Sequence, residues 1–233
     1  MKNLAGGVAS LTSLVALAAP AAPATAADHV TLGDVRVALH PDTRQVVTVH
    51  HTRGFHARVG FWVHRQHRWT RVYDVRDGRI GYGGLVAGAK RVQGSGTTPL
   101  GTVRLISAFG RHLRGAGWDL PYRRTHRGDF WVEDNRSPFY NRYRNRAQGG
   151  FRWWIPASHT NSSERLTDFA QQYEYSIVTS YNRAQVRHRG AGIFLHVNGS
   201  GATAGCVSAP RSFLRRMMWR LDPGQAPVMA VGR

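Results

Sequence analysis

Short stretches rich in valine and aromatic residues, with partial alternation of apolar and polar positions, recur along most of the chain. The stretch "TRQVVTVHHT" at residues 43–52 is one example, and "ARVGFWVHRQHRWTRVYDV" at residues 57–75 is another. Such patterns are typical of strands, and "RQH" inside the second stretch predicts a hairpin turn. The same reasoning predicts strands at residues 79–86, 101–109, 128–135, 175–182, 190–197 and 226–232.

Two stretches have helical spacing instead. In Ser162–Tyr173 the apolar residues recur at i, i+3, i+4 and i+7, which places them on one helical face. Pro210–Leu221 begins with the proline that helix N-termini tolerate and carries a second apolar stripe, and "DPG" at residues 222–224 ends it. The whole pattern predicts a mostly β domain with two or three short helices.

The first 27 residues have the composition of a secretory signal peptide. Lys2 provides a positive start, residues 11–19 are apolar, and "ATA" at residues 24–26 matches the small-residue cleavage site. The apolar run is shorter than the ~20 residues of a transmembrane helix. We therefore expect a signal peptide at residues 1–27 and an exported domain at residues 28–233, secreted or envelope-associated. Retention of the segment as an uncleaved anchor is the alternative.

Charge narrows the set of partners. The chain has a formal net charge of +19 and 42% hydrophobic residues, enough apolar material for a real core. Basic faces bind nucleic acid, but here the arginines are scattered along the chain, and an exported protein meets little nucleic acid. An anionic cell envelope is the better electrostatic partner. We expect no nucleic acid and no stable protein partner.

The single cysteine, Cys206, follows His196 by ten residues in "HVNGSGATAGC". One cysteine cannot form an intramolecular disulfide, so the thiol is a buried small hydrophobe, an intermolecular partner or a reactive group. A glycine loop before a predicted helix would lower the thiol pKa and present the N–H groups of Gly205 and Cys206 as an oxyanion hole. A cysteine beside a histidine base is suited to acyl transfer through a thioester.

The segment "HVNGSGATAGCVS" resembles the active-site signature of the L,D-transpeptidase catalytic domain, also called the YkuD domain, in an exported actinobacterial-type member. Thr203, Gly205, Cys206 and Val207 match its end, and His196 matches the base. Two earlier segments resemble the family in the right order, "KRVQGSGTTPLG" at 90–101 and "FWVEDNRSPFYN" at 130–141. The resemblance covers roughly residues 36–232 and implies a β-sandwich or barrel-like catalytic fold.

The resemblance also implies an activity in peptidoglycan synthesis and cell shape. The Cys206 thiolate would attack the carbonyl after the L-centre of diaminopimelate in a tetrapeptide stem, and D-alanine would leave, protonated by His196. An amine of a second stem would then resolve the thioester into a 3→3 cross-link, whereas water would make the protein an L,D-carboxypeptidase. Thr203 and Ser208 would position substrate beside Gly205, and no cofactor is expected.

Two departures from the family pattern keep other functions open. Ala204 replaces the usual second histidine, and Ser208 replaces the usual arginine or asparagine. A poorly formed acceptor site would favour the hydrolase, and loss of catalysis would leave a basic cell-wall binding module. Ser208 is equally suited to cap the following helix.

Metal and nucleotide sites are not expected. The pairs His50-His51 and His64-x-x-His67 lie in strand-like segments without a carboxylate cluster, and no H-E-x-x-H motif occurs. The segment "GSGTTPLG" lacks the Lys-Ser/Thr ending of a phosphate loop. Lys90 and Arg91 are candidates for contact with a substrate carboxylate, with solvated surface charge as the plainer interpretation.

Overall fold

The computed structural model describes residues 28–233, so the signal peptide expected at residues 1–27 lies outside the described residues. The first eight strands are β1 (Asp28–Leu32), β2 (Val35–Leu39), β3 (Gln45–Arg53), β4 (His56–Arg65), β5 (Arg68–Arg79), β6 (Leu85–Ala87), β7 (Thr98–Gly110) and β8 (Tyr122–Arg124). The others are β9 (Asp129–Trp131), β10 (Tyr143–Asn145), β11 (Glu164–Arg165), β12 (Tyr175–Thr179), β13 (Phe194–Val197), β14 (Val207–Ala209) and β15 (Val228–Gly232).

Eight of these strands close into a barrel. Their order is β12-β13-β14-β5-β4-β3-β15-β7, and β7 pairs back onto β12. Most neighbours are antiparallel, but β13 and β14 run parallel, as do β15 and β3. The parallel β13–β14 pair brings the segments before and after the cysteine loop side by side, which sets the geometry of the candidate site.

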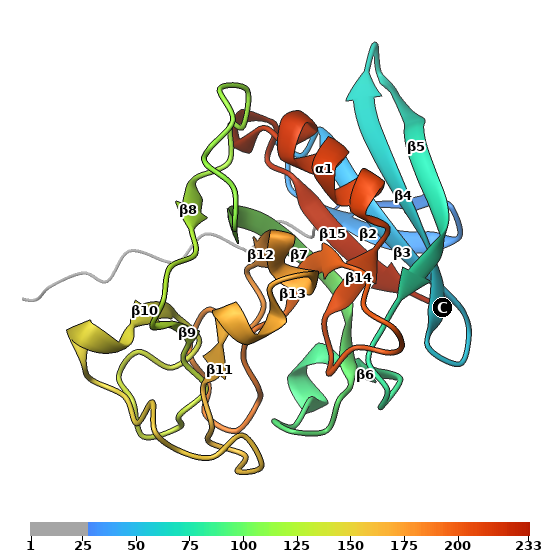
Figure 1. The fold of residues 1–233 in the computed structure, drawn as a ribbon. Coiled ribbons are helices and arrows are strands. Elements are labelled where there is room, and N and C mark those ends of the chain that lie inside the picture. The colour runs from blue at the N-terminus through green and yellow to red at the C-terminus, as the bar shows by residue number, and fades with distance from the viewer. Residues whose placement is uncertain (1–27) are drawn as a thin grey trace, which may run out of the picture.

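The barrel interior holds the main hydrophobic core. Strand side chains alternate between the two faces, so Val47, Val49 and Phe61 point inward and are buried. The α-helix α1 (Arg211–Arg220) adds four fully buried side chains to the same core, Phe213, Leu214, Met217 and Met218. Figure 1 shows this helix lying across the barrel beside β14 and β15. The predicted helix at Pro210–Leu221 is thereby confirmed.

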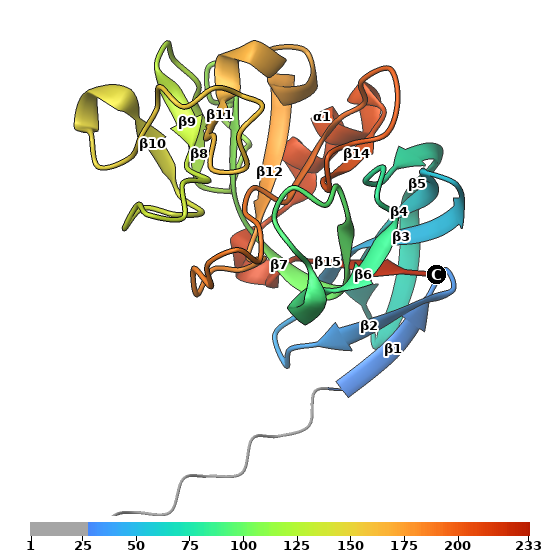
Figure 2. The same cartoon turned by 90° about the horizontal axis from the view of Figure 1, so that it is seen from below.

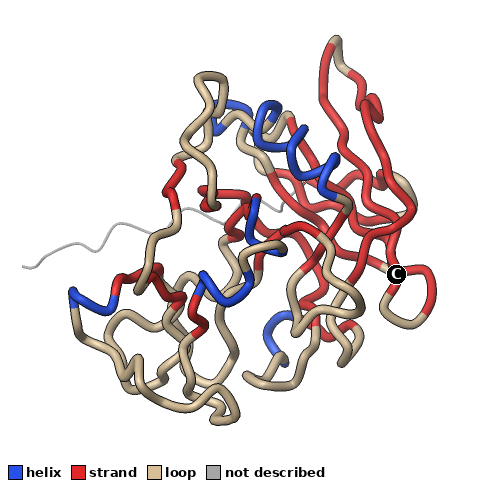
Figure 3. The backbone as a smooth tube through the Cα atoms, viewed as in Figure 1, coloured by secondary structure: helices blue, strands red, loops and turns tan. Residues whose placement is uncertain are grey.

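A small sheet lies beside the barrel. Its order is β10-β9-β11, and Figures 1 and 2 show it away from the β4–β5 hairpin, among long loops that Figure 3 draws in tan. A second hydrophobic cluster joins this sheet to the outer face of the barrel and includes Trp131, Tyr173, Phe194 and Cys206. The cysteine therefore lies between the barrel and the small sheet, outside the barrel core.

The expected fold class is confirmed, because the described chain is mostly β and has one α-helix together with short 3-10 turns. The "RQH" hairpin is also confirmed, since β4 and β5 meet at Gln66 and His67, whose φ angles are +48° and +62°. The α-helix expected at Ser162–Tyr173 is wrong. That stretch forms β11 and two 3-10 turns, at Leu166–Phe169 and Gln172–Glu174.

The cause of that error is tertiary. Glu164 and Arg165 pair with Trp131 and Phe130 of β9, so hydrogen bonds to another segment replace the first helical turn. Residues three apart also share a face in a 3-10 turn, and Leu166 is buried there without an α-helix. The strand expected at residues 79–86 is likewise mostly a loop, between the end of β5 and the start of β6.

Candidate functional site

The register of β13 and β14 places the cysteine and the histidine on one face. His196 pairs with Ser208 and Leu195 with Val207, which puts Cys206 level with Phe194. Leu195 and Val207 point into the barrel core, so His196 and Cys206 point to the opposite, outer face. They are diagonal neighbours on the same face of this parallel strand pair, because His196 is opposite Ser208 and Cys206 lies two residues before Ser208.

Cys206 is buried, and its thiol is hydrogen-bonded to the backbone. The S–H donates to the Gly192 carbonyl at 3.0 Å, and the Phe194 N–H donates to Sγ at 3.3 Å. Burial raises the pKa of the Cys206 thiol well above its ordinary value, and the nearby Glu164 carboxyl adds to the rise. The expected low thiol pKa is therefore wrong for the free protein.

The position of the helix explains the difference. Strand β14 separates Cys206 from α1, which begins only at Arg211. The helix effect on a charge fades within the first turn, so the thiolate gains little from α1. Ser208 does not cap the helix, because Pro210 is the N-cap residue and no side chain caps it. The Ser208 hydroxyl instead donates to Asn198 Oδ1 at 2.7 Å.

His196 is buried and held in one orientation. Its Nδ1 lies 2.8 Å from the carbonyl oxygen of Val197, so the neutral ring carries its proton on Nδ1 and leaves the Nε2 lone pair free. Burial lowers the pKa of His196 to about 4, because desolvation disfavours the charged ring. The ring also packs edge-on against Tyr173, with 5.4 Å between centroids. The free Nε2 can accept a proton, and the lowered pKa makes the ring a weaker base than an ordinary histidine in the free protein.

Thr203 and Gly205 shape the turn that carries the thiol. The Thr203 hydroxyl donates to the Cys206 carbonyl at 2.6 Å and accepts from the Gly205 N–H at 3.2 Å. Thr203 is also fixed by the backbone around β5 and β6, since its N–H donates to Ile80 and its carbonyl accepts from Tyr82. The Gly205 N–H assigned to the oxyanion hole is thus occupied within the loop, and Thr203 acts on the loop itself.

A cavity of about 370 Å³ opens beside the thiol. Its charged and phenolic lining includes Arg91, Glu133, Glu164 and Tyr173, and Ala204 also faces it. A second, smaller hollow contains His196 and Thr203 and shares Glu164 and Tyr173 with the first. Cys206 and His196 therefore face two adjoining spaces, and no hydrogen bond joins the two side chains in the described part of the chain.

Sequence reasoning missed part of this lining. Lys90 is exposed, but Arg91 is only 6% exposed and faces the cavity, so surface charge does not describe it. Glu133 lies inside the quoted "FWVEDN" segment and received no role. Glu164 and Tyr173 fell in a stretch assigned to a helix. The one local signal available for Glu133 was its place directly after the apolar residues 130–132.

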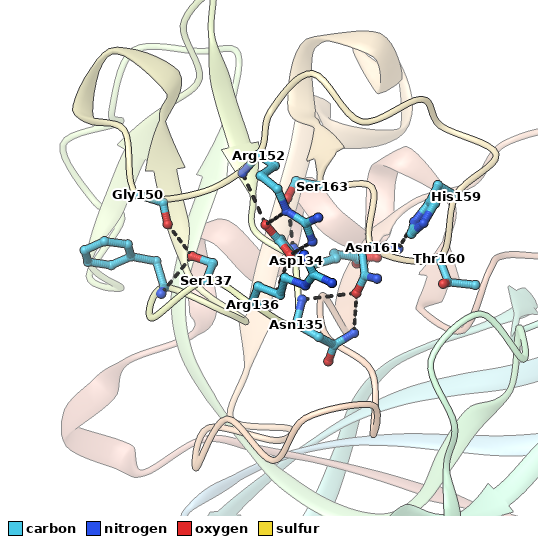
Figure 4. A network of polar contacts seen from close by, with 12 residues as sticks. Asp134, Asn135, Arg136, Ser137, Gly150, Arg152, His159, Thr160, Asn161 and Ser163 are labelled. Atoms are coloured by element: carbon cyan, nitrogen blue, oxygen red, sulfur yellow. Dashed lines mark hydrogen bonds and ion pairs between the residues drawn. The ribbon is translucent and has the colours of Figure 1, made fainter.

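A polar network fixes the loop that borders the cavity (Figure 4). Asp134 is buried and accepts hydrogen bonds from the Arg152 side chain and from the backbone N–H of Arg152. Asn135 donates to Asn161 Oδ1 at 2.7 Å, and the Ser163 hydroxyl accepts from the Glu133 N–H. These bonds tie the loop at residues 149–163 to residues 133–135, which follow β9. Ile155 and Ser162, both in this loop, line the cavity.

Metal and membrane features were sought in residues 28–233. No group of three or more His, Cys, Asp or Glu side chains there is arranged to hold a metal ion. No helix in that range combines the length and the apolar character needed to cross a membrane.

Comparison with known proteins yields one distant likeness. No protein-family model matches the chain, and no curated protein matches it. Two solved structures of Pgp2, the helical cell shape determining protein of Campylobacter jejuni, are similar to it, one of them a mutant. The mutant is 12% identical over 84% of this chain, and the other structure is 13% identical over 83%. Both have a TM-score of 0.43 and are covered over 49% of their length, so this chain spans about half of each.

Proposed function

We propose that this protein is an exported cysteine acyltransferase of the cell envelope, an L,D-transpeptidase that acts on peptidoglycan stem peptides. The observation that carries the proposal is the placement of Cys206 at the edge of a cavity, with His196 as its diagonal neighbour on the same face of β13–β14. The resemblance of residues 196–208 to the family signature supplies the substrate class. The net charge of +19 suits an anionic envelope.

The geometry suggests how the first step would proceed. His196 is neutral above its pKa of about 4, which leaves Nε2 open to a proton, and we infer that it accepts the Cys206 proton only as sulfur attacks the donor carbonyl and the two groups form an ion pair. The S–C bond forms, the C–N bond to D-alanine breaks, and the imidazolium returns the proton to the leaving amine. An acceptor amine then attacks the thioester, the S–C bond breaks, and the proton released by the amine returns to sulfur through His196.

The raised thiol pKa fits a nucleophile that ionises only with its substrate. In the free protein the thiol donates to the Gly192 carbonyl and stays protonated at neutral pH. Proton transfer to His196 during attack avoids a free buried thiolate, which desolvation makes costly. General-base help of this kind contributes about 10²–10⁴-fold in rate.

The test is mass spectrometry of the mature protein incubated with purified tetrapeptide muropeptides, with and without a free amine acceptor. We expect an acyl-enzyme mass and cross-linked product from wild type, neither from Cys206→Ala, and a rate about 10²–10⁴-fold lower from His196→Ala. His40→Ala is the matched control, because His40 is exposed. Release of D-alanine with no transfer product would instead identify an L,D-carboxypeptidase.

The raised thiol pKa also favours a second candidate, a basic cell-wall binding module without catalysis. Such a module would bind purified sacculi with wild-type affinity after Cys206→Ala and would form no adduct with a carbapenem, whose strained ring mimics an acyl donor. A single carbapenem adduct per chain, absent in Cys206→Ala, would exclude this candidate.

A further inference from the structure

The cavity beside Cys206 is lined by a guanidinium and two carboxyl groups that form no ion pair with each other. Arg91 is 6% exposed and donates through Nε to the Thr97 carbonyl at 2.7 Å and through Nη1 to the Arg189 carbonyl at 3.3 Å. No carboxylate of residues 28–233 lies within ion-pair distance of its guanidinium. A buried charge is costly unless it is compensated, so this cation is poised for an anionic ligand.

The backbone next to the thiol is shaped around that guanidinium. A Cβ on Gly190 would lie 1.6 Å from Arg91 Nη1, and a Cβ on Gly205 would lie 2.6 Å from Nη2. Glycine at both positions lets the chain approach the side chain closely. Arg91 is therefore in direct contact with the residue before Cys206, which places its positive charge beside the proposed nucleophile.

Two carboxyl groups line the same cavity. A Cβ on Gly192 would lie 3.1 Å from Glu133 Oε1, and the Gly192 carbonyl is the acceptor of the thiol proton. The Glu133 carboxyl group has no hydrogen bond to another described residue, whereas Glu164 Oε1 accepts from the Tyr173 hydroxyl at 2.6 Å. The carboxyl groups thus lie against Gly192 and Tyr173, while the guanidinium lies against Gly190 and Gly205.

We propose that this cavity binds a zwitterionic amino-acid group of the acyl donor, with its carboxylate at Arg91 and its ammonium at Glu133 and Glu164. The inference rests on the proposed function, because it names the donor chemistry that the cysteine site selects. A cavity of about 370 Å³ is within the usual range for small-ligand sites. One group carrying both charges would pair with the guanidinium and, through its ammonium, with the carboxylates that it ionises, whereas a neutral or singly charged group would leave one of these pairings unmade.

Ligand binding should also release protons. Burial, with repulsion from Glu164, raises the pKa of Glu133 to about 8, and burial raises the pKa of Glu164 to about 7. The groups facing them are Arg91, Tyr173 and Cys206, with Arg165 and Asp168 also lining the cavity. An ammonium favours the ionised carboxylates and lowers their pKa. Binding at pH 7 should therefore release protons, and less so above pH 8, where the carboxyls are already ionised.

The experiment uses calorimetry with Cys206→Ala, which separates binding from chemistry. The probe is the tetrapeptide L-Ala-γ-D-Glu-meso-diaminopimelate-D-Ala, compared with the same peptide acetylated on the free side-chain amine or amidated on the side-chain carboxylate. We expect each modification to weaken Kd by about 10–100-fold. Titration in buffers of different ionisation enthalpy should show proton release with the unmodified peptide and less with the acetylated one.

A second substitution locates the ammonium site. When Glu133→Gln is added to Cys206→Ala, the acetylated peptide should bind almost as tightly as the unmodified one. The amidated peptide should still bind more weakly than the unmodified one. Asp42→Asn is the matched control, because it removes the same charge from an exposed residue, with a side chain 76% exposed. Equal Kd values for all three peptides, or no measurable binding to folded protein, would overturn the proposal.

The outcomes separate this proposal from the proposed function. If Cys206→Ala binds the three peptides with different Kd values but wild type forms no acyl-enzyme, the zwitterion site is supported and the acyltransferase function is rejected. If wild type forms an acyl-enzyme but the three peptides bind Cys206→Ala with equal Kd values, the acyltransferase function is supported and the zwitterion site is rejected.

Discussion

Replacing Gly205 by alanine should destabilise the protein through the loop that carries Cys206. Gly205 has φ +128°, a region that side chains rarely adopt. An added Cβ would lie 2.6 Å from Arg91 Nη2 and 2.8 Å from the Thr97 carbonyl oxygen. Arg91 is buried and already bonded to that carbonyl, so neither neighbour can move freely, and the loop must shift instead.

The magnitude follows from two terms. A non-glycine residue held in a sparsely populated backbone region costs about 1–3 kcal/mol. Overpacking a closely packed site by one methyl group costs about 1–3 kcal/mol more. We therefore expect Gly205→Ala to lower the free energy of unfolding by about 2–6 kcal/mol. The shift of Arg91 should also change the environment of the adjoining thiol.

The assay is urea unfolding of the mature chain, followed by tryptophan fluorescence. Gly201→Ala is the matched control in the same loop, because a Cβ there meets nothing within 4 Å and should change stability by no more than about 0.5–1 kcal/mol. With a slope of about 2–3 kcal/mol/M, Gly205→Ala should lower the midpoint by roughly 0.7–3 M. A midpoint equal to wild type, or equal damage from Gly201→Ala, would refute the reasoning.

Three further predictions use the titratable groups and the loop network. Hydrogen bonding to Arg211 lowers the pKa of Glu174 to about 2, so its stabilising effect is complete above about pH 4.5 and is lost toward pH 2. Urea unfolding should show the deficit of Glu174→Gln, about 1–2 kcal/mol after allowance for solvent screening, shrinking across that range. Burial lowers the pKa of His196 to about 4, so between pH 6.5 and pH 4 the unfolded chain binds a proton at this residue that the folded chain does not. The free energy of unfolding should therefore fall by up to about 3 kcal/mol over that range. His196→Gln should not show this fall in the same assay. Asp134→Asn should weaken the hydrogen-bonded ion pair that holds Arg152, so limited trypsin cleavage within residues 149–163 should become faster. An unchanged cleavage rate would show that this ion pair does not hold the loop.

Local pattern was enough for much of the barrel. Partial alternation in residues 43–52 and 57–75 predicted β3, β4 and β5, because each strand buries one face and the period of two is visible in the chain itself. The helix at Arg211–Arg220 was predictable for a similar reason, since its apolar stripe and its flanking prolines are local. Ser162–Tyr173 was not, because pairing of Glu164 with β9 decided its conformation.

The candidate site also has a part that could be predicted from local sequence and a part that could not. Cys206 and His196 could be singled out from their spacing, their residue types and the resemblance to a known signature. The thiol pKa could not be predicted, because it depends on the burial of Cys206 against Gly192 and Phe194 and on β14 lying between it and α1. Proximity to a helix in sequence did not bring the thiol to the helix in space.

The charged lining of the cavity is decided only by tertiary structure. Arg91, Glu133 and Glu164 come from segments separated by 42 and 31 residues in the sequence, and each alone resembles a surface charge. Closure of β7 onto β12 and packing of the small sheet bring them to one cavity beside Cys206. The sequence by itself determined the chemistry that is available, whereas burial, which sets the strength and ionisation of charges, arises only when distant segments pack together.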